Sequence, residues 1–384
     1  MPKPLPADPW QGFQPGDWQQ RADVESFILC NSLPYTGDDS DLTGPTERTQ
    51  AIWLQAQMLL QAERATVHRG RRRGGALQPD FLDRREELIF GMLASPGGER
   101  LPTGGDCRQL ALYGARQLRH TGTQPEVIAA IADLARYYDI DIDPPAATAQ
   151  QAIQWTFLAL LATRDPLVGR RRTLSGLDVF FDIYLQRDLD RGVLIEEEAQ
   201  ELIDDLTIKL RLARPTGDAA TVLPALYLPL AGQTVTRTGF RLVNTLYTLG
   251  PAAAPHLLVL WSTALSDTFR RFCAEVTIDT SSLSYAQALP LPEAGHSRTM
   301  SPDRLGATRS AQVYTLCQLL DALDGSSTLG INVLRREVLS AILARPNRYG
   351  YLTVQLPGGA VDLHHLNPAA RQDVLQQLLT SFES

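Results

Sequence analysis

Hydrophobic positions recur with the spacing of an amphipathic helix through most of the first 215 residues. The clearest case is Glu196–Arg214, which opens with three glutamates and closes with basic residues. That charge order is favourable for the helix dipole. Its apolar stripe repeats every four residues, at Leu202, Leu206 and Leu210. The pattern predicts a mostly helical N-terminal part at residues 1–215.

Other segments show the same period or carry helix-capping residues. A capping box at Thr148-x-x-Gln151 predicts a helix that continues through Leu161, with apolar residues on all faces and therefore buried. Pro368, preceded by an asparagine, predicts the start of the last helix, which ends near Phe382. The remaining predicted helices are Asp23–Leu29, Thr46–Arg64, Phe81–Leu93, Gln109–Arg119, Pro125–Tyr138, Leu177–Leu189, Arg241–Leu249, Ser266–Phe272, Thr308–Leu323 and Val333–Ala344.

After Pro215 the pattern changes to short β-type runs spaced among the helices. Strands are predicted at Thr221–Leu230, Leu257–Trp261 and Ala274–Asp279, and a loop is predicted at Leu289–Pro302. Two further short runs flank Pro357-Gly358-Gly359 and predict a hairpin over Tyr351–Leu363. We therefore expect a mixed α/β fold.

Composition indicates a globular chain and excludes several classes of protein. The 384 residues are 44% hydrophobic and 21% charged, with a net charge of −7, which argues against a nucleic-acid or anionic-membrane binder. The polar N-terminus and the absence of a long apolar run predict a cytoplasmic protein without a membrane segment. The four cysteines, Cys30, Cys107, Cys273 and Cys317, are far apart and indicate neither zinc nor a disulfide framework.

Common catalytic and binding motifs give no support to other functions. The chain has no Walker A motif, no G-x-G-x-x-G after a strand and no G-x-S-x-G elbow. Asp279-Thr-Ser-Ser282 is a single copy, whereas aspartic proteases need two carboxylates that share a proton. His364-His365 places adjacent side chains on opposite faces of a strand, so no metal site is predicted.

Several stretches together resemble pyruvate formate-lyase, a glycyl radical enzyme. The matching segments keep the family's order and spacing through most of the chain. They include Ala149-Gln-x-Ala-Ile-Gln-Trp-Thr156, Asn244-Thr-Leu-Tyr-Thr-x-Gly-Pro251, Leu260-Trp-Ser262, Ile278-Asp-Thr-Ser-Ser-Leu283, Ile331-Asn-Val333 and Arg336-Glu337.

The resemblance implies a barrel of two half-barrels wrapped by helices, with two loops meeting inside. One loop carries a radical on a glycine Cα, and the other carries adjacent cysteines that relay the radical and take an acetyl group from pyruvate to coenzyme A. An S-adenosylmethionine activating enzyme installs the radical. For this chain, about half the family length, we expect a single unit over 1–384 with a reduced, partial barrel. The strand-containing part would be 216–384, and its segment 331–384 would resemble the glycyl-radical end.

The chain departs from the family at the positions that carry this chemistry. Gly358 falls on the radical position, but Gln355 replaces the family's arginine and Gly359 its tyrosine. Arg298 and Thr299 stand where the family has its cysteine pair. Neither side chain can form a thiyl radical or a thioester. Arg309 is the candidate for a substrate-binding arginine, displaced by one residue from the family pattern.

Two leading functions follow from the sequence. The first is a divergent pseudoenzyme without acetyl-CoA and formate production, acting as a structural, regulatory or ligand-binding protein of anaerobic metabolism. Its expected partners are a second copy of the chain or a full-length relative, with no bound cofactor. The alternative is an enzyme of changed chemistry or substrate with its radical at Gly358, which would need the activating enzyme. Weaker alternatives are a spare part that replaces a damaged C-terminal segment, which would not need the N-terminal scaffold, and a decayed gene product, against which the consistent helix caps argue.

Overall fold

The computed structural model describes most of the chain and separates it into two compact units. The described residues are 23–70, 106–120, 125–137, 139–162, 172–212, 226–232, 234–290, 295–323, 325, 327–344, 352–357, 359–363, 366 and 368–382. Unit 1 comprises the described residues within 1–31, 45–167 and 184–216, and unit 2 those within 32–44, 168–183 and 217–384. Helix α7 (Leu177–Asp190) is continuous between them, changing unit after Ile183.

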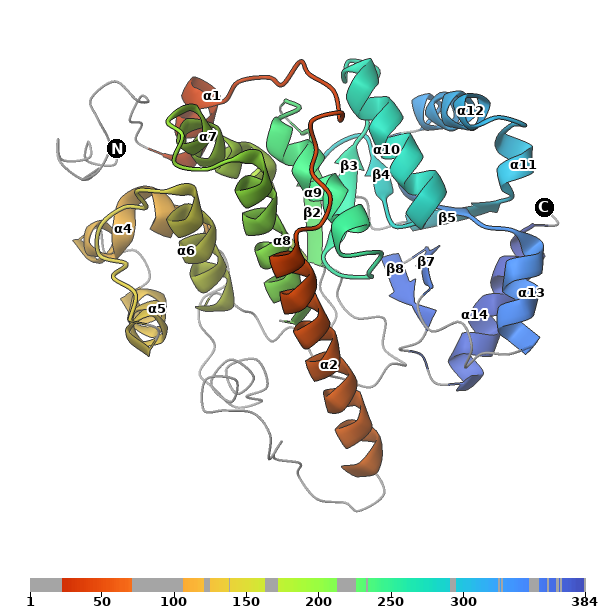
Figure 1. The fold of residues 1–384 in the computed structure, drawn as a ribbon, viewed down its shortest axis with the longest axis horizontal. Coiled ribbons are helices and arrows are strands. Elements are labelled where there is room, and N and C mark those ends of the chain that lie inside the picture. The colour runs from red at the N-terminus through yellow and green to blue at the C-terminus, as the bar shows by residue number, and fades with distance from the viewer. Residues whose placement is uncertain are drawn as a thin grey trace. The chain divides into compact units, whose positions relative to one another are not determined.

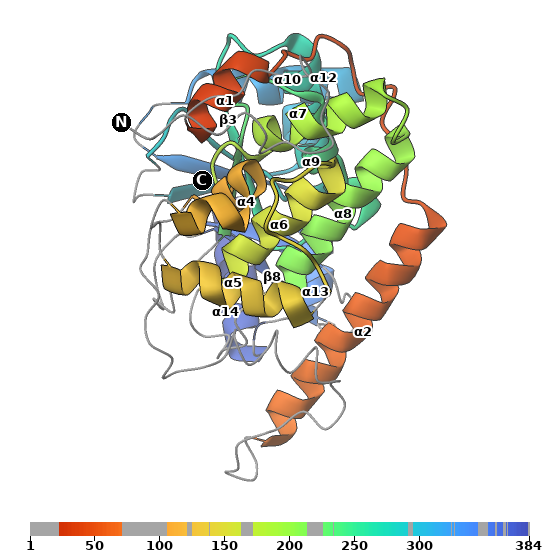
Figure 2. The same ribbon diagram turned by 90° about the vertical axis from the view of Figure 1, so that its left-hand side faces the viewer.

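Apart from the shared α7, the described elements of unit 1 are helices, as the apolar spacing predicts. They are α1 (Val24–Asn31), α2 (Glu47–Gly70), α4 (Gln109–His120), α5 (Pro125–Tyr137), α6 (Ala149–Ala162) and α8 (Glu196–Leu212). Helix α6 packs against α4, α5 and α8, and α2 packs along α8 (Figure 2). The predicted cap at Thr148 is confirmed, since the Gln151 amide donates to Thr148 Oγ1 at 3.2 Å, while the Gln151 side chain accepts from the Ala147 amide and not from that of Thr148. The predicted helix at Phe81–Leu93 lies outside the described residues.

Unit 2 contains a six-stranded mixed sheet and a separate hairpin, so the chain has the predicted mixed α/β fold (Figure 1). In the sheet, β1 to β4 are parallel neighbours, β4 and β6 are antiparallel, and β5 is parallel to β6. The strands are β1 (Arg172–Thr173), β2 (Leu226–Leu230), β3 (His256–Leu260), β4 (Ser284–Ala286), β5 (Gly295–Met300), β6 (Thr328–Val333), β7 (Thr353–Leu356) and β8 (Gly359–Asp362). The other helices of unit 2 are α9 (Arg237–Thr248), α10 (Asp267–Thr280), α11 (Pro302–Leu305), α12 (Arg309–Asp321), α13 (Arg336–Ala344) and α14 (Pro368–Ser381).

The predicted strand at Ala274–Asp279 is wrong, because these residues form the second half of α10. The β-branched residues in this segment favoured a strand. The helix instead begins at the cap Ser266, whose side chain accepts from the Phe269 amide. From there it buries Phe269, Phe272, Cys273 and Val276 on one face. Burial of a helical stripe outweighs the weak strand propensity of single residues.

The predicted loop at Leu289–Pro302 is also wrong, since it contains β5. The helix predicted over Val333–Ala344 begins only at Arg336, after β6. Strands β5 and β6 pair in parallel, with Gly295 opposite Thr328 and Met300 opposite Val333. The partner lies more than thirty residues away in sequence, so local patterns do not reveal this pairing.

A local apolar core stabilises the C-terminal part of unit 2. It joins α13, the β7–β8 hairpin and α14, with contributions from the partly buried side chains around it. Its buried members are Leu334, Leu339, Ile342, Val354, Leu363, Leu375, Leu378 and Phe382. The hairpin therefore has a hydrophobic support on one side. Among the described residues, no helix combines the length and apolar character needed to cross a membrane.

Candidate functional site at the C-terminal hairpin

The predicted C-terminal hairpin is confirmed by the pairing of β7 with β8. Their antiparallel register runs from Thr353 opposite Asp362 to Leu356 opposite Gly359. Gly359 has a φ of 130°, a value that favours glycine. The candidate radical position, Gly358, lies outside the described residues. The site is therefore built from the residues on either side of it and from the strands that β7 contacts.

Gln355, which the resemblance predicts at the position of the family's arginine, is fully buried and uses both ends of its side chain. Its Oε1 accepts from Ser284 Oγ at 3.0 Å, and its Nε2 donates to the Ser281 carbonyl at 3.1 Å. Its main chain bonds to Asn332 of β6: the Gln355 amide donates to Asn332 Oδ1 at 2.7 Å, and Asn332 Nδ2 donates to the Gln355 carbonyl at 2.9 Å. The Asn332 side chain thus acts as a peptide group of an adjoining strand.

Further buried polar groups extend these contacts into a network. Asn332 Nδ2 also donates to Thr299 Oγ1 at 3.3 Å, and Ser284 Oγ lies 2.7 Å from His256 Nε2. We call this set the hairpin network; its members are His256, Ser281, Ser284, Thr299, Asn332 and Gln355, all buried. Because unpaired buried polar groups are costly, a connected network of this kind holds one arrangement of the strands.

Ser281 joins the densest stretch of family resemblance to the hairpin. It ends α10 in a left-handed conformation, with a φ of 51°. Its hydroxyl accepts from the Val333 amide at 2.9 Å, and its carbonyl accepts from Gln355. The Ser-Ser-Leu segment of the sequence pattern is therefore a helix end that supports β6 and β7 together.

Two glycines allow β7 and the hairpin turn to approach the sheet closely. A Cβ on Gly330 of β6 would lie 2.6 Å from Gln355 Cβ, and one on Gly295 of β5 would lie 2.1 Å from the Pro357 carbonyl oxygen. Both distances are shorter than any normal contact of a Cβ atom. Pro357 thus lies beside Gly295, at the start of β5. Thr299 is four residues further along the same strand, so it lies about 13 Å from Gly295 at the rise of a β-strand.

Of the two residues predicted to stand in place of the cysteine pair, only Thr299 joins the network. Thr299 is buried and hydrogen-bonded, while Arg298 beside it on β5 is exposed. Arg309 lies on α12, where it pairs with Asp279 at 2.7 Å and donates to the Glu275 carbonyl at 3.0 Å. Its side chain is 42% exposed. Its contacts are thus with α10 and not with the hairpin network.

Two of the four cysteines lie in unit 2, in α10 and α12. Burial raises the pKa of the Cys273 thiol well above its usual value, and the nearby Cys317 raises it further. Burial also raises the pKa of the Cys317 thiol. Because the thiolate is the reactive form, both sites disfavour nucleophilic chemistry at neutral pH. Cys273 is fully buried within α10, where it packs as a small apolar residue.

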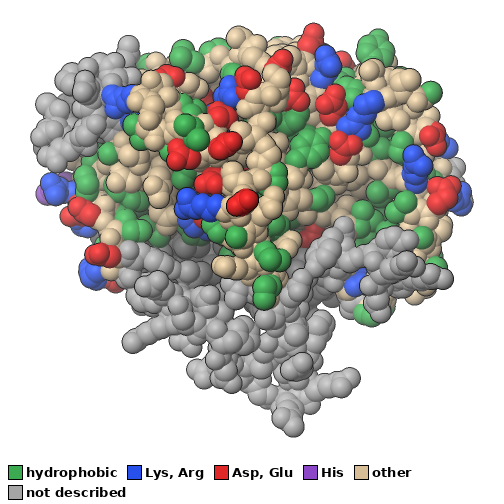
Figure 3. Space-filling model, viewed as in Figure 1, with side chains coloured by type: hydrophobic (Ala, Val, Ile, Leu, Met, Phe, Trp, Pro, Cys, Tyr) green, Lys and Arg blue, Asp and Glu red, His purple; other side chains and the backbone are tan. Residues whose placement is uncertain are grey.

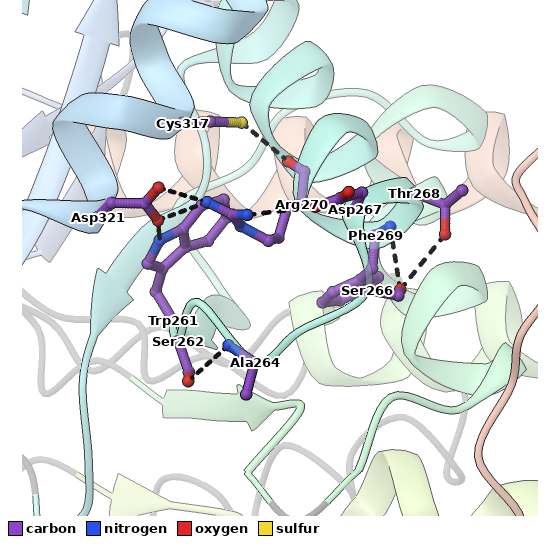
Figure 4. A network of polar contacts seen from close by, with 10 residues as sticks. All are labelled: Trp261, Ser262, Ala264, Ser266, Asp267, Thr268, Phe269, Arg270, Cys317 and Asp321. Carbon is purple, nitrogen blue, oxygen red and sulfur yellow. Dashed lines mark hydrogen bonds and ion pairs between the residues drawn. The ribbon is translucent and has the colours of Figure 1, made fainter.

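The residue after β3, Trp261, ties the end of that strand to α10 and α12 (Figure 4). Its Nε1 donates to Asp321 Oδ1 at 2.9 Å, and the same carboxylate pairs with Arg270. The Arg270 guanidinium lies 5.2 Å from the centre of the indole ring, a cation–π arrangement. Cys317 Sγ lies 3.8 Å from the Arg270 carbonyl oxygen. This set explains the Leu-Trp-Ser resemblance as packing between elements.

A second buried polar group in unit 2 fixes the loop after β2. Asp178 of α7 accepts from the Ala231 amide at 2.9 Å, and Asp182, one turn later, accepts from the Thr238 amide at 2.9 Å. Burial raises the pKa of Asp178 to about 6. Burial also raises the pKa of Asp182, opposed by Arg241, whose guanidinium lies 3.9 Å away. Both carboxylates accept hydrogen bonds from main-chain amides, so their role in this arrangement is structural.

Comparison with known proteins finds relatives of this chain. The family model described as "Pyruvate formate lyase-like" matches residues 108–294. Formate acetyltransferase of Haemophilus influenzae is 28% identical over 389 residues, which cover 72% of this chain and 50% of that protein. Formate acetyltransferase 1 of Escherichia coli is 29% identical over 394 residues, which cover 73% of this chain and 52% of that protein. The chain is thus a distant homologue of formate acetyltransferases and is similar to the pyruvate formate-lyase-like family over residues 108–294.

The chain spans about half the length of the curated relatives it matches. Among solved structures, it is similar to the hydroxyproline dehydratase of Clostridioides difficile, with 18% identity and a TM-score of 0.33 over 47% of this chain and 24% of that one. It is also similar to the B12-independent glycerol dehydratase of Clostridium butyricum, with 15% identity and a TM-score of 0.34 over 67% of this chain and 32% of that one.

The hairpin network joins residues inside the family match to residues that follow it. His256, Ser281 and Ser284 lie inside the matched range, and the other three members follow it. The sequence drew attention to Gln355 as a replaced residue and to Asn332 within Ile331-Asn-Val333, but did not predict that they bond to each other. In the described part of the chain, no three His, Cys, Asp or Glu side chains gather in a way that could hold a metal ion.

Proposed function

We propose that this chain is a pyruvate formate-lyase-like protein without acetyl-transfer activity, which serves as a structural, regulatory or ligand-binding protein. One observation carries the proposal: Arg298 and Thr299 occupy the position where the family resemblance expects two adjacent cysteines. A thioester requires a sulfur nucleophile, and neither side chain supplies one.

The surroundings of this position support the same conclusion. Thr299 is 7% exposed, and its hydroxyl accepts from Asn332, so it takes part in packing β5 against the hairpin. Cys273 and Cys317 have raised thiol pKa values, which favours their neutral, unreactive form. Cys30 and Cys107 belong to unit 1 and are distant in sequence from the family's cysteine position.

The hairpin supports a structural role for the segment that resembles the glycyl-radical loop. Gln355 bonds to three other members of the hairpin network, and Gly330 leaves space for its side chain. Each buried hydrogen bond contributes about 1 kcal/mol net, and an orphaned partner costs more. The segment therefore gains stability from staying in place, independent of any radical chemistry.

An anaerobic assay tests the proposal. The chain is incubated with an S-adenosylmethionine activating enzyme, pyruvate and coenzyme A, and acetyl-CoA and formate are measured, with formate acetyltransferase 1 of Escherichia coli as the positive control. We expect no product above background. Turnover by the chain would refute the proposal.

Paramagnetic resonance on the same samples tests the alternative. A doublet after activation that is absent in Gly358→Ala would show a glycyl radical, and hence an enzyme of changed chemistry, even when acetyl-CoA does not form. We expect no doublet, because Gln355 and Gly359 replace the arginine and tyrosine of the family's radical loop.

A further inference from the structure

A small cavity opens in unit 2 where β5 and β6 end. The two strands are parallel, and their ladder closes with the Leu334 amide donating to the Met300 carbonyl at 3.0 Å. The chain then enters α11 from β5 and α13 from β6, so both connections begin at one edge of the sheet (Figure 1). Ligands of α/β proteins bind preferentially outside the carboxyl ends of parallel strands.

The cavity measures about 240 Å³, which is room for several water molecules or one small polar group. It is lined by residues of the β5–α11 and β6–α13 connections and by one aromatic side chain that follows α14. The lining residues are Ser301, Asp303, Arg304, Arg335, Arg336, Glu337 and Phe382. Basic and acidic side chains stand close together at the right-hand edge of the space-filling view, where these helices lie (Figure 3).

Two of the three arginines, Arg304 and Arg335, are exposed, and their guanidinium groups have no partner among the described residues. Across the described residues, Arg304 and Arg335 make no side-chain hydrogen bond or ion pair, in contrast to Arg270 and Arg309. The Ser301 hydroxyl, next to them, does not cap α11. The cavity thus collects donors of Ser301, Arg304 and Arg335 that no group in the described part of the chain accepts.

We propose that this cavity binds a phosphate group, either inorganic phosphate or the phosphate of a small phosphomonoester. Planar guanidinium groups recognise phosphate oxygens through paired hydrogen bonds, and the Ser301 hydroxyl supplies another donor. The first turn of α13 also faces this edge, and its dipole favours negative charge. The carboxylates of Asp303 and Glu337 can accept from ligand hydroxyls, and Phe382 offers an apolar contact.

This site goes beyond the proposed loss of acetyl transfer and does not depend on it. None of its lining residues belongs to the hairpin network. An active acetyl transferase could hold phosphate here, and an inactive protein could fail to do so. The results of the acetyl-CoA assay and of the binding assay are therefore independent, and each tests its own proposal.

Calorimetric titration of the whole chain in a buffer free of phosphate and sulfate tests the site. Inorganic phosphate and glycerol phosphate are the two probes, and tighter binding of the second identifies a phosphomonoester site. We expect saturable binding that weakens as sodium chloride is raised. Arg304→Ala and Arg335→Ala should each weaken it at least about tenfold, the effect of losing a hydrogen bond to a charged group.

The control variant is Arg271→Ala, which removes an exposed arginine of α10 that does not line the cavity and should bind like the wild type. Arg335→Lys keeps the charge and the stem but loses the paired donors, so it should bind more weakly while circular dichroism stays unchanged. Absence of saturable binding by the wild-type chain would overturn the proposal. Wild-type affinity in a folded Arg304→Ala/Arg335→Ala double variant would also overturn it.

Discussion

Asn332 is the residue on which the position of the C-terminal hairpin depends most. Its side-chain amide satisfies both the N–H and the C=O of Gln355, at 2.7 and 2.9 Å, and reaches Thr299 as well. All these groups are buried. Asn332→Ala would leave two main-chain groups without a partner, at a cost of about 1–3 kcal/mol each. With the cavity left by the amide, the expected destabilisation is about 4 kcal/mol.

Hydrogen exchange read by mass spectrometry is the assay suited to this variant, because the two units need not unfold together. We expect faster exchange in the peptide that contains Gln355, together with a lower urea midpoint for unit 2. Peptides of α6 in unit 1 serve as the internal reference.

Asn332→Asp separates the hydrogen bonds from the loss of volume. It keeps the side chain's shape and its acceptor for the Gln355 amide, but places a second oxygen against the Gln355 carbonyl. It should therefore destabilise the hairpin at neutral pH almost as strongly as alanine does. A loss below about 1 kcal/mol for Asn332→Ala, the size of a single net hydrogen bond, with unchanged exchange at Gln355, would refute the reasoning.

Three further predictions follow from buried or exposed groups in unit 2. Burial raises the pKa of Asp178 from 3.8 to about 6, so its contribution to stability is greatest below pH 3.8 and is lost as the pH rises through 6. The free energy of unfolding of the wild type, measured with denaturant at each pH and compared with that of Asp178→Asn, should thus fall by about 3 kcal/mol between pH 4 and 7. A difference between the two proteins that stays constant over this range would contradict the prediction. Gly330→Ala places a Cβ 2.6 Å from Gln355 Cβ and should cost about 1–3 kcal/mol in urea unfolding, and an unchanged midpoint would show that β7 can shift freely. Arg309→Ala removes a half-exposed ion pair with Asp279 and should change stability by less than about 1 kcal/mol; a larger loss would show that its bond to the Glu275 carbonyl matters more.

Elements with a local signature could be predicted from the sequence. The helices of unit 1 follow from an unbroken apolar period and from caps such as Thr148, which depend on neighbouring residues only. The terminal hairpin follows from the turn chemistry of Pro357 and the glycines after it. The resemblance of ordered motifs led to the family, because order and spacing survive when overall identity is low.

Strands whose partners are distant in sequence could not be predicted in this way. In β5, the residues alternate between more and less exposed positions without a strong apolar pattern, and the strand is defined by its ladder with β6. The second half of α10 has strand-forming residues, but a cap and a buried face decide for a helix. In both places, interactions across tens of residues outweigh propensities of about 1 kcal/mol or less.

Residue types and their spacing predict the family resemblance, the hairpin and, as an expectation, the loss of a cysteine pair at Arg298 and Thr299. What these residues contact depends on the tertiary structure. It buries Gln355 against Gly330, joins it to Asn332, and leaves Arg309 at an exposed ion pair. Hydrogen-bond partners and close approaches depend on where strands meet in space, which residue types and spacing do not specify.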